Sequence, residues 1–423
     1  MRLELSAHDR AMLDGTSGQA ARFAMRLLIG AAEATAAPRL ISVASAHLVG
    51  CFYTGTVGVD YARRLVSLGA EVRIPTTLNT GAVDLVHSPA RDHSGPSASE
   101  ARELMGLYRK MGARPTWTCT PYQAGHRPAF AEQVAWGESN AVAFANSVLG
   151  ARTNRYGDFL DVAAALTGRV PYTGLHCPEN RRGQVLVRVD AEIGRRLLDE
   201  DVFYAVLGHV IGQECGNAVP VVAGLDPAAV TEDRLKALGA AASASGGVGL
   251  FHVVGVTPEA PSMEAAFQGA EPEGTVTIGP VRIRAGRDSL TSGSTPDRPG
   301  AVCLGTPHLS LAEFTSIIAL LDGRAPEVPL YLSTSRHVHG QLRETGLLSA
   351  LDRPGIRIVE DTCTYFPGVL SADTGSVMTS SAKWAYYGPG NLGITVAFGS
   401  MRECVESAVA GRVRRDERLW ADA

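Results

Sequence analysis

The sequence lacks the features that mark several large classes of protein. No apolar run in its 423 residues reaches membrane-spanning length, and residues 1–15 lack the apolar stretch of a signal peptide. The net charge of −4 comes without a basic stripe, which argues against nucleic acid as a main partner. We therefore expect a cytoplasmic protein that binds neither nucleic acid nor membrane.

Common catalytic and structural signatures are missing as well. The seven cysteines are odd in number and scattered, so they do not suggest a disulfide framework. There is no P-loop, no dinucleotide fingerprint, no HExxH and no nucleophile elbow. The glycine-rich stretch SASGGVG at 243–249 matches no phosphate-binding motif. The chemistry must therefore be sought in other residues.

What the chain does have is an alternation of short apolar strands with helices. The expected strands are 40–45, 71–74, 184–189, 218–224, 248–255, 301–305, 328–333 and 355–360, with one more ending at TWT before Cys119. The expected helices are 17–36, one opened by a capping box at Ser97–Glu100, and one opened by a capping box at Ser310–Glu313. Such alternation predicts an α/β fold with mainly parallel sheets, divided into regions 1–220 and 221–423.

One run, EQVAWGESNAVAFANSVLGARTNRYGD at 132–158, is too polar for an ordinary core. It is also too specific for a solvated linker, which favours Lys, Pro and Gly repeats. Its short hydrogen-bonding groups are Glu138, Ser139, Asn140, Asn146, Ser147, Arg152, Thr153, Asn154 and Arg155. Arginine forks hold carboxylates and phosphates in two parallel hydrogen bonds, so this run predicts a site for a small anionic ligand.

Two cysteines and a histidine follow predicted strands. Cys119 and Cys363 both follow a threonine at a strand end, where they could converge on one metal or cluster. The alternative is that each is a small buried apolar residue. His308 precedes the capped helix at Ser310, where it could act as a base, a ligand or an oxyanion donor. The alternative for His308 is a hydrogen bond to local backbone.

Two further stretches offer polar groups at turns. Thr77 and Asn79 follow the predicted strand at 71–74, and Ser381 and Lys383 lie in SSAKWAYYGPG. A lysine near aromatic rings binds an anion or moves a proton when its pKa is lowered. The alternative for Lys383 is a surface ammonium.

These stretches together resemble the large subunit of the aconitase X family. The resemblance rests on PTTLNTGAVD, MGARPTWTCTPY, WGESNAVAFANSVLGARTNRYGDFLD, LTGRVPYTGLH, LGTPHLS, EDTC and MTSSAKWAYYGPG, in the family's order over roughly residues 40–400. It implies an aconitase-like, multi-domain, three-layer α/β/α fold and hydro-lyase chemistry on a small hydroxy carboxylate. It also implies a small swivelling domain, which we expect to be absent from this chain and supplied as a separate small subunit.

The resemblance implies an iron–sulfur cluster or iron held by three cysteines, two of which correspond to Cys119 and Cys363. The third position, in a GCPH motif, is Thr306 here, and a hydroxyl is a poor iron ligand compared with a thiolate. Cys303 lies three strand residues earlier and points to the opposite face. Three possibilities follow: two cysteines with an outside ligand, a single metal ion, or no metal.

The resemblance also suggests roles. Arg152, Asn154 and Arg155 would cradle the substrate carboxylate together with Thr77, Asn79 and Ser381. Lys383 or His308 would handle protons, and Glu138, Ser139 and Asn140 would orient the site, with Glu138 as an alternative base. The expected reaction is dehydration of cis-3-hydroxy-L-proline to 1-pyrroline-2-carboxylate. The alternatives are another hydroxy acid, such as mevalonate 5-phosphate or a specialised metabolite, and a non-catalytic binding subunit.

Overall fold

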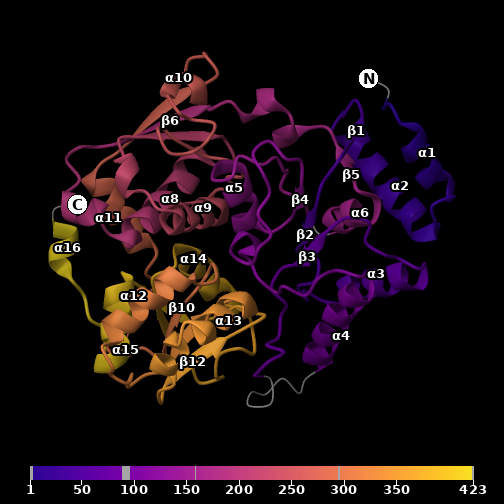
Figure 1. The fold of residues 1–423 in the computed structure, drawn as a ribbon. Coiled ribbons are helices and arrows are strands. Elements are labelled where there is room, and N and C mark those ends of the chain that lie inside the picture. The colour runs from indigo at the N-terminus through magenta and orange to yellow at the C-terminus, as the bar shows by residue number, and fades with distance from the viewer. Residues whose placement is uncertain (1–2, 88–95, 158, 294–295, 422–423) are drawn as a thin grey trace. The chain divides into compact units, whose positions relative to one another are not determined.

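The computed structural model describes residues 3–87, 96–157, 159–293 and 296–421 (Figure 1). The chain divides into two compact units. The first unit comprises Met1–Val83 and Asp92–Arg181, and the second comprises Asp84–Arg91 and Arg182–Ala423. The boundary expected near residue 220 falls inside a strand of the second unit. Among the described residues, no helix is long and apolar enough to cross a membrane.

The first unit contains two small sheets. Its helices are α1 (Ala7–Asp14), α2 (Gln19–Ala34), α3 (Thr56–Ser67), α4 (Pro96–Lys110), α5 (Ser139–Ser147) and α6 (Leu160–Thr167), with short 3₁₀ turns η2 (Pro121–Gln123), η3 (Gly174–His176) and η4 (Pro178–Arg181). Strands β1 (Leu40–Ser42) and β5 (Arg169–Pro171) pair antiparallel. Strands β2 (Ala46–Leu48), β3 (Thr76–Leu78) and β4 (Ala135–Trp136) form a parallel sheet in the order β3-β2-β4. Parallel strands share one carboxyl edge, so the loops that follow these three strands gather there.

The second unit begins with a four-stranded parallel sheet, in the order β8-β7-β6-β9. Its strands are β6 (Val185–Val189), β7 (Pro220–Ala223), β8 (His252–Val253) and β9 (Gly274–Ile278), and its helices are α7 (Arg195–Leu198), α8 (Asp201–Cys215), α9 (Glu232–Ser245), α10 (Met263–Ala266) and α11 (Pro280–Ser289), with η5 (Pro227–Ala229). Helices α8 and α9 approach closely because Gly208 has no side chain: a Cβ there would lie 2.2 Å from the Leu238 carbonyl oxygen.

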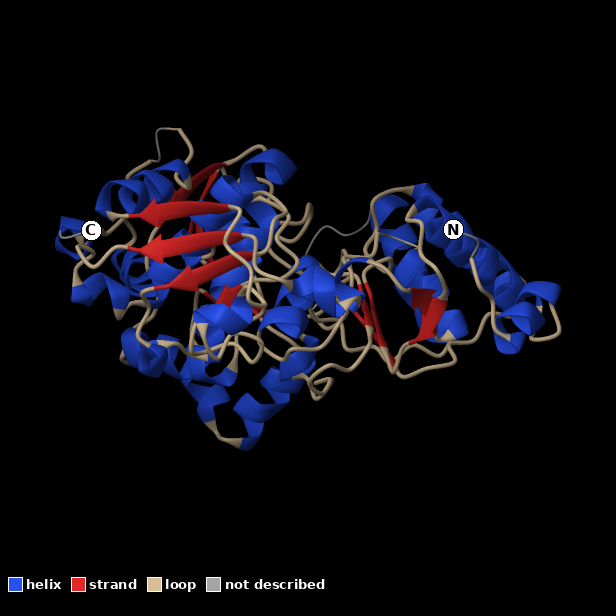
Figure 2. Cartoon of the chain, turned by 90° about the horizontal axis from the view of Figure 1, so that it is seen from above, coloured by secondary structure: helices blue, strands red, loops and turns tan. Residues whose placement is uncertain are grey.

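The second unit continues with a five-stranded parallel sheet, in the order β12-β11-β10-β13-β14. Its strands are β10 (Ala301–Leu304), β11 (Leu330–Ser333), β12 (Ile356–Val359), β13 (Ser376–Thr379) and β14 (Thr395–Phe398). Its helices are α12 (Leu311–Leu321), α13 (Arg336–Glu344), α14 (Ala382–Leu392), α15 (Met401–Ala410) and α16 (Glu417–Ala421), with η6 (Leu347–Leu351). Figure 2 shows strands of the second unit side by side, pointing the same way among helices.

The predicted fold class is confirmed, and two predicted strands are wrong. Residues 71–74 form no ladder, because the amides of Val72 and Arg73 bond to two different partners and Pro75 has no N–H. The strand begins at Thr76 instead. The segment before Cys119 makes a single bridge to β3, because the Thr116 hydroxyl bonds both the N–H and the carbonyl of Leu78.

The two predicted capping boxes have different outcomes. Ser310 and Glu313 cap α12 reciprocally, as expected. Helix α4 already begins at Pro96, so Ser97 lies inside the helix and does not cap it. The Glu100 carboxylate instead accepts a hydrogen bond from the Tyr53 hydroxyl. Proline at the first position suits a helix start, since its missing N–H would have had no partner there.

Candidate functional site

His308 lies in the loop that joins β10 to α12. The loop leaves the sheet at Gly305, whose φ is +100° and whose missing Cβ would lie 2.2 Å from the Ser333 carbonyl oxygen. The Leu309 amide then bonds the same Ser333 carbonyl at 3.0 Å. His308 is fully buried, and its Nε2 lies 3.2 Å from the Thr362 carbonyl oxygen. A carbonyl only accepts, so Nε2 carries a proton that it donates to Thr362.

Cys363 lies in the loop after β12 and is 2% exposed. Asp361, two residues before Cys363, has φ +65°, and its carboxylate accepts two hydrogen bonds from Arg336, at 2.7 and 2.5 Å. This clamp fixes the loop at the carboxyl edge of the sheet. His308 and Cys363 thereby offer a nitrogen and a sulfur within 4.8 Å of each other.

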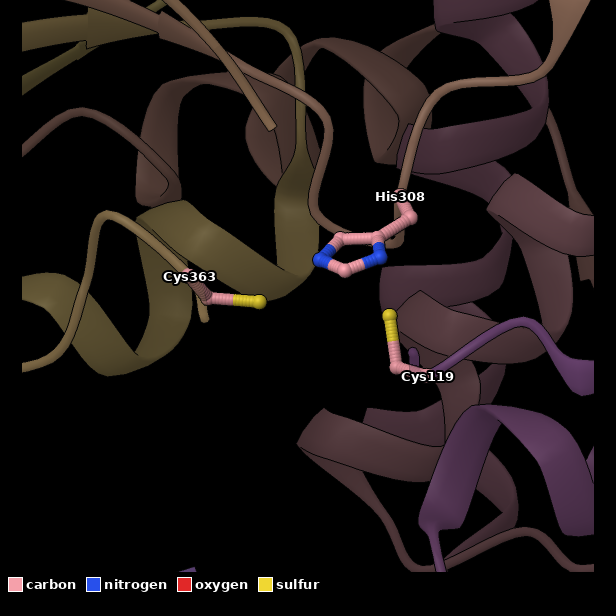
Figure 3. A group of neighbouring side chains, drawn as sticks. All are labelled: Cys119, His308 and Cys363. Atoms are coloured by element: carbon pink, nitrogen blue, oxygen red, sulfur yellow. The ribbon is translucent and has the colours of Figure 1, made fainter. Parts of the chain in front are cut away.

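Imidazole nitrogen and thiolate sulfur together suit iron or zinc. A ligating histidine usually donates its other ring N–H to a carbonyl or carboxylate, and the Thr362 carbonyl fills that role for His308. Figure 3 shows the His308 ring and the Cys363 sulfur, and it also draws Cys119, a buried cysteine of the first unit. The residues present thus fit a metal ion.

Cys119 is held by its backbone. The side-chain amide of Asn140 donates to the Cys119 carbonyl oxygen at 3.0 Å and lies 3.0 Å from the Tyr122 hydroxyl. Tyr122 in turn stacks on Phe144, with ring centroids 3.6 Å apart. Asn140 therefore holds the backbone of the cysteine loop, and its role toward substrate stays a prediction.

Thr306 occupies the position where the family resemblance implies a cysteine. Its side chain is 4% exposed, and its hydroxyl has no hydrogen-bond partner among the residues that the structure describes. Cys303 does not replace it, because that residue lies in the buried strand β10 and not in the loop that carries Thr306. Burial raises the pKa of the Cys404 thiol, and Cys303 adds to that increase. Neither Thr306 nor Cys303 therefore supplies a third thiolate.

A cavity of about 60 Å³ adjoins the Thr306 loop within the second unit. Its polar lining comes from Lys236, Thr306, Glu313, Ser380, Ser381 and Lys383. Ser381 caps α14 by accepting from the Trp384 amide at 3.0 Å, and its hydroxyl donates to the Thr306 carbonyl. Lys383 is 5% exposed, so it is not the surface ammonium of the alternative interpretation.

In the first unit, Thr77 lies between two histidines. Its hydroxyl is 2.8 Å from Nδ1 of His47 and 2.8 Å from Nδ1 of His126. Burial, reinforced by Arg114, lowers the pKa of His126 to about 4, and burial lowers the pKa of His47 as well. The Thr77 hydroxyl can donate to only one of the two rings, but it can accept from the Nδ1–H of either ring. Sequence reasoning missed His126, since nothing in its local sequence points to Thr77.

The polar run divides between helix capping and loop bracing. Glu138 is the N-cap of α5 and accepts from the Ala141 amide at 2.7 Å, while Ser139 donates to Glu138 at 3.2 Å. The Asn154 side chain donates to the Thr173 carbonyl at 2.9 Å and accepts from the Leu175 amide at 2.7 Å. These groups hold the backbone of the first unit. Any contact between these side chains and substrate would come in addition to these hydrogen bonds with the backbone.

Arg181 is a further residue that sequence reasoning missed. It is 1% exposed and donates to the side-chain and main-chain oxygens of Asn146, at 3.0 and 2.9 Å, and to the Leu175 carbonyl at 3.0 Å. Asn146 also exchanges two hydrogen bonds with the backbone of Thr153. Of the predicted carboxylate-binding arginines, Arg152 is half-buried and Arg155 is exposed. The buried guanidinium of this region is thus Arg181.

Three profiles of known protein families match this chain. Profiles described as Aconitase X first domain, second domain and third domain match residues 2–179, 183–288 and 299–410. The chain belongs to the aconitase X family. The first profile ends close to the end of the first unit, and the other two match within the second.

Relatives and a solved structure agree with this assignment. A cis-3-hydroxy-L-proline dehydratase of Pseudomonas aeruginosa is 43% identical, over 98% of this chain and 72% of that protein. A phosphomevalonate dehydratase large subunit of Methanocaldococcus jannaschii is 31% identical, over 95% of this chain and 99% of that protein. The crystal structure of Thermococcus kodakaraensis aconitase X in its holo-form matches 96% of this chain with a TM-score of 0.85 and 33% identity.

Proposed function

We propose that this aconitase X chain catalyses the dehydration of cis-3-hydroxy-L-proline to 1-pyrroline-2-carboxylate. The observation that carries the proposal is the 43% identity to the Pseudomonas aeruginosa enzyme, together with 38% identity to the cis-3-hydroxy-L-proline dehydratase of Hypocrea jecorina. Identity to the phosphomevalonate dehydratase large subunits is lower, at 31–36%. All of these relatives are named as dehydratases, so the reaction type rests on more observations than the substrate does.

We further propose that His308 and Cys363 hold one iron ion, and Cys119 keeps its place as the other thiolate that the family resemblance predicts. Each side chain is at most 4% exposed, and each is a ligand type that iron accepts. His308 would thus take the place of the third thiolate that Thr306 cannot provide. One nitrogen and two sulfurs favour a single ion over a cluster, because clusters are usually held by three or four thiolates. When bound, the ion would act as a Lewis acid for the departing hydroxyl group.

The chain's own residues would bind the substrate and move its protons. A base removes the proton from C2, hydroxide leaves C3, and the resulting enamine tautomerises to the cyclic imine. Lys383 and Ser381, beside the small cavity, offer a cation and a helix N-terminus for the substrate carboxylate or for a proton transfer. Thr77, Asn79, Arg152 and Arg155 stay predicted contacts, and Glu138 and Ser139 keep their predicted orienting role, with Glu138 as the alternative base.

A small subunit is the proposed partner. Five of the relatives are named phosphomevalonate dehydratase large subunits, a name that implies a small-subunit partner for those proteins. We infer that a swivelling domain on a second polypeptide closes the site and shields the reaction from water. The cytoplasmic location stays a prediction.

The test is a direct comparison of substrates on the complex with its small subunit. We expect turnover of cis-3-hydroxy-L-proline, followed by trapping of the cyclic imine product, and no turnover of mevalonate 5-phosphate. Turnover of mevalonate 5-phosphate alone would move the proposal to the alternative substrate. Binding of either compound without turnover would favour a binding subunit. Iron and sulfide analysis of the same preparation should give iron without sulfide.

A further inference from the structure

The chain uses lysine very rarely. Of its 39 lysines and arginines, three are lysines, namely Lys110, Lys236 and Lys383. Lys110 is exposed, whereas Lys236 and Lys383 are buried and line the same 60 Å³ cavity. In a chain that otherwise relies on arginine for positive charge, two buried ammonium groups at one cavity suggest that a compact ammonium is needed there.

The Lys236 ammonium has a full set of partners. It lies 2.8 Å from the Asp233 carboxylate, in hydrogen-bond contact with the Glu313 carboxylate, and 3.4 Å from the His308 carbonyl oxygen. Three acceptors match the three N–H groups of an ammonium. Lys236 is 2% exposed, so water does not compete strongly for these contacts.

Both carboxylates are themselves tied to the loop that carries His308. The Ser310 hydroxyl donates to Asp233 at 2.7 Å, and the Ser310 amide donates to Glu313 at 2.7 Å. The Glu313 amide completes the capping box at 3.1 Å from the Ser310 hydroxyl. The first turns of α9 and α12 therefore both contact the Lys236 ammonium. The loop that carries His308 leads from the sheet into this contact.

The charges reinforce this arrangement. Burial opposes the ammonium, but Glu313 and Asp233 outweigh it and raise the pKa of Lys236. Burial also raises the pKa of Glu313, and Lys236 offsets part of that increase. Despite burial, Lys236 and Ser310 hold the pKa of Asp233 below its ordinary value.

We propose that Lys236 is a positioning residue that fixes His308 through its backbone carbonyl. This inference rests on the proposed role of His308 as a metal ligand. With the carbonyl held by Lys236 and Nε2 held by the Thr362 carbonyl, the ring has two fixed points. The ring would then already have its orientation when a metal ion binds, without a loss of loop entropy at that moment.

Arginine would not reproduce this geometry. A guanidinium is planar and directs its donors in a fork, whereas an ammonium directs three donors tetrahedrally. The fork suits a carboxylate pair but leaves the third direction, toward the His308 carbonyl, unfilled. Lys236→Arg therefore keeps the charge balance with Asp233 and Glu313 and removes the tether to His308.

The first measurement is amide hydrogen exchange in Lys236→Arg without metal. The Leu309 and Ser310 amides should exchange about 10-fold faster, while the amides of β11 should stay at the wild-type rate. Lys110→Met, which removes an exposed lysine of α4, is the control and should change neither region. An equal increase in β11 would mean a general loss of folding stability and would overturn the proposal, as would wild-type exchange throughout.

The second measurement is a Co²⁺ titration followed by absorption, which reports thiolate and imidazole ligation. Lys236→Arg should bind Co²⁺ about 10- to 100-fold more weakly than wild type, as is usual when a group that orients a metal ligand is changed. Unchanged affinity with faster loop exchange would overturn the positioning of His308. If wild type itself bound no Co²⁺, the metal site in the proposed function would fail, and the exchange data would still decide whether Lys236 holds the loop.

Discussion

The polar run of the first unit and the short motifs of the second unit use polar residues in opposite ways. In the first unit, the side chains of Asn146 and Asn154 form hydrogen bonds with backbone groups, among them the amide and carbonyl of Thr153. In the second unit, His308 and Cys363 stand beside each other with ligand atoms within 4.8 Å. The polar run of the first unit therefore braces backbone, whereas the two side chains of the second unit bring possible metal-ligand atoms together at the carboxyl ends of parallel strands.

The reason for the difference is the cost of burial. Residues 148–153 form an irregular segment in which most of the other amides bond backbone carbonyls, but the Thr153 amide and carbonyl have no such partner among the described residues. The side chain of Asn146 bonds both of these Thr153 groups. The β10–α12 loop solves the same problem with backbone contacts to β11, because Leu309 bonds Ser333 directly. The His308 ring bonds the Thr362 carbonyl through Nε2 instead of bracing its own loop.

The largest effect that we expect is the loss of activity when a proposed metal ligand is replaced. Cys363→Ser and His308→Asn should each lower kcat/KM by about 1000-fold or more, because a lost ligand costs more than the 10- to 100-fold of an orienting partner. Thermal unfolding of the metal-free chain should change little for Cys363→Ser. Iron content and kcat/KM should fall together, and full activity with full iron in either variant would remove that residue from the site.

The next largest effect that we expect is the loss of folding stability when the hydrogen bonds of Arg181 in the first unit are removed. Arg181→Met keeps much of the side-chain volume but removes the hydrogen bonds to Asn146 and Leu175, so the free energy of unfolding should fall by about 3 kcal/mol. Chemical denaturation measures it. Arg182→Met is the matched control, since that neighbour pairs with Glu273 at the surface, 34% and 51% exposed, and should cost less than about 1 kcal/mol.

These contrasts show what the sequence could and could not predict. The alternation of strands and helices predicted the α/β class, and the Ser310–Glu313 spacing predicted a real capping box, because both depend on local pattern. The strand before Cys119 was wrong because a side chain, Thr116, takes the place of a ladder. Arg181 escaped notice since its partners lie up to 35 residues away along the chain.

A smaller effect concerns acid stability in the first unit. The folded pKa of His126 is about 4, below the ordinary 6.5, so the unfolded chain binds its proton first as the pH falls. The contribution is fully present above pH 6.5 and is lost between pH 6.5 and 4, for up to about 3 kcal/mol. His126→Gln should reduce the slope of the unfolding free energy against pH in that window. The reduction should correspond to about one bound proton. An unchanged slope would mean that His126 titrates normally.

The smallest change in stability that we expect is for Arg155, at the exposed end of the polar run. The same substitution tests whether this end of the run contacts substrate. Arg155→Ala should alter the free energy of unfolding by less than about 0.5 kcal/mol, because Arg155 is exposed. Asn154→Ala should cost about 1–2 kcal/mol, because the Thr173 carbonyl and the Leu175 amide lose their partner. If KM for substrate rises at least about 10-fold in Arg155→Ala at unchanged stability, the run combines scaffold and substrate contact. If KM stays at the wild-type value, the polar run of the first unit is scaffold at this end, and the anion site must be sought nearer Lys383.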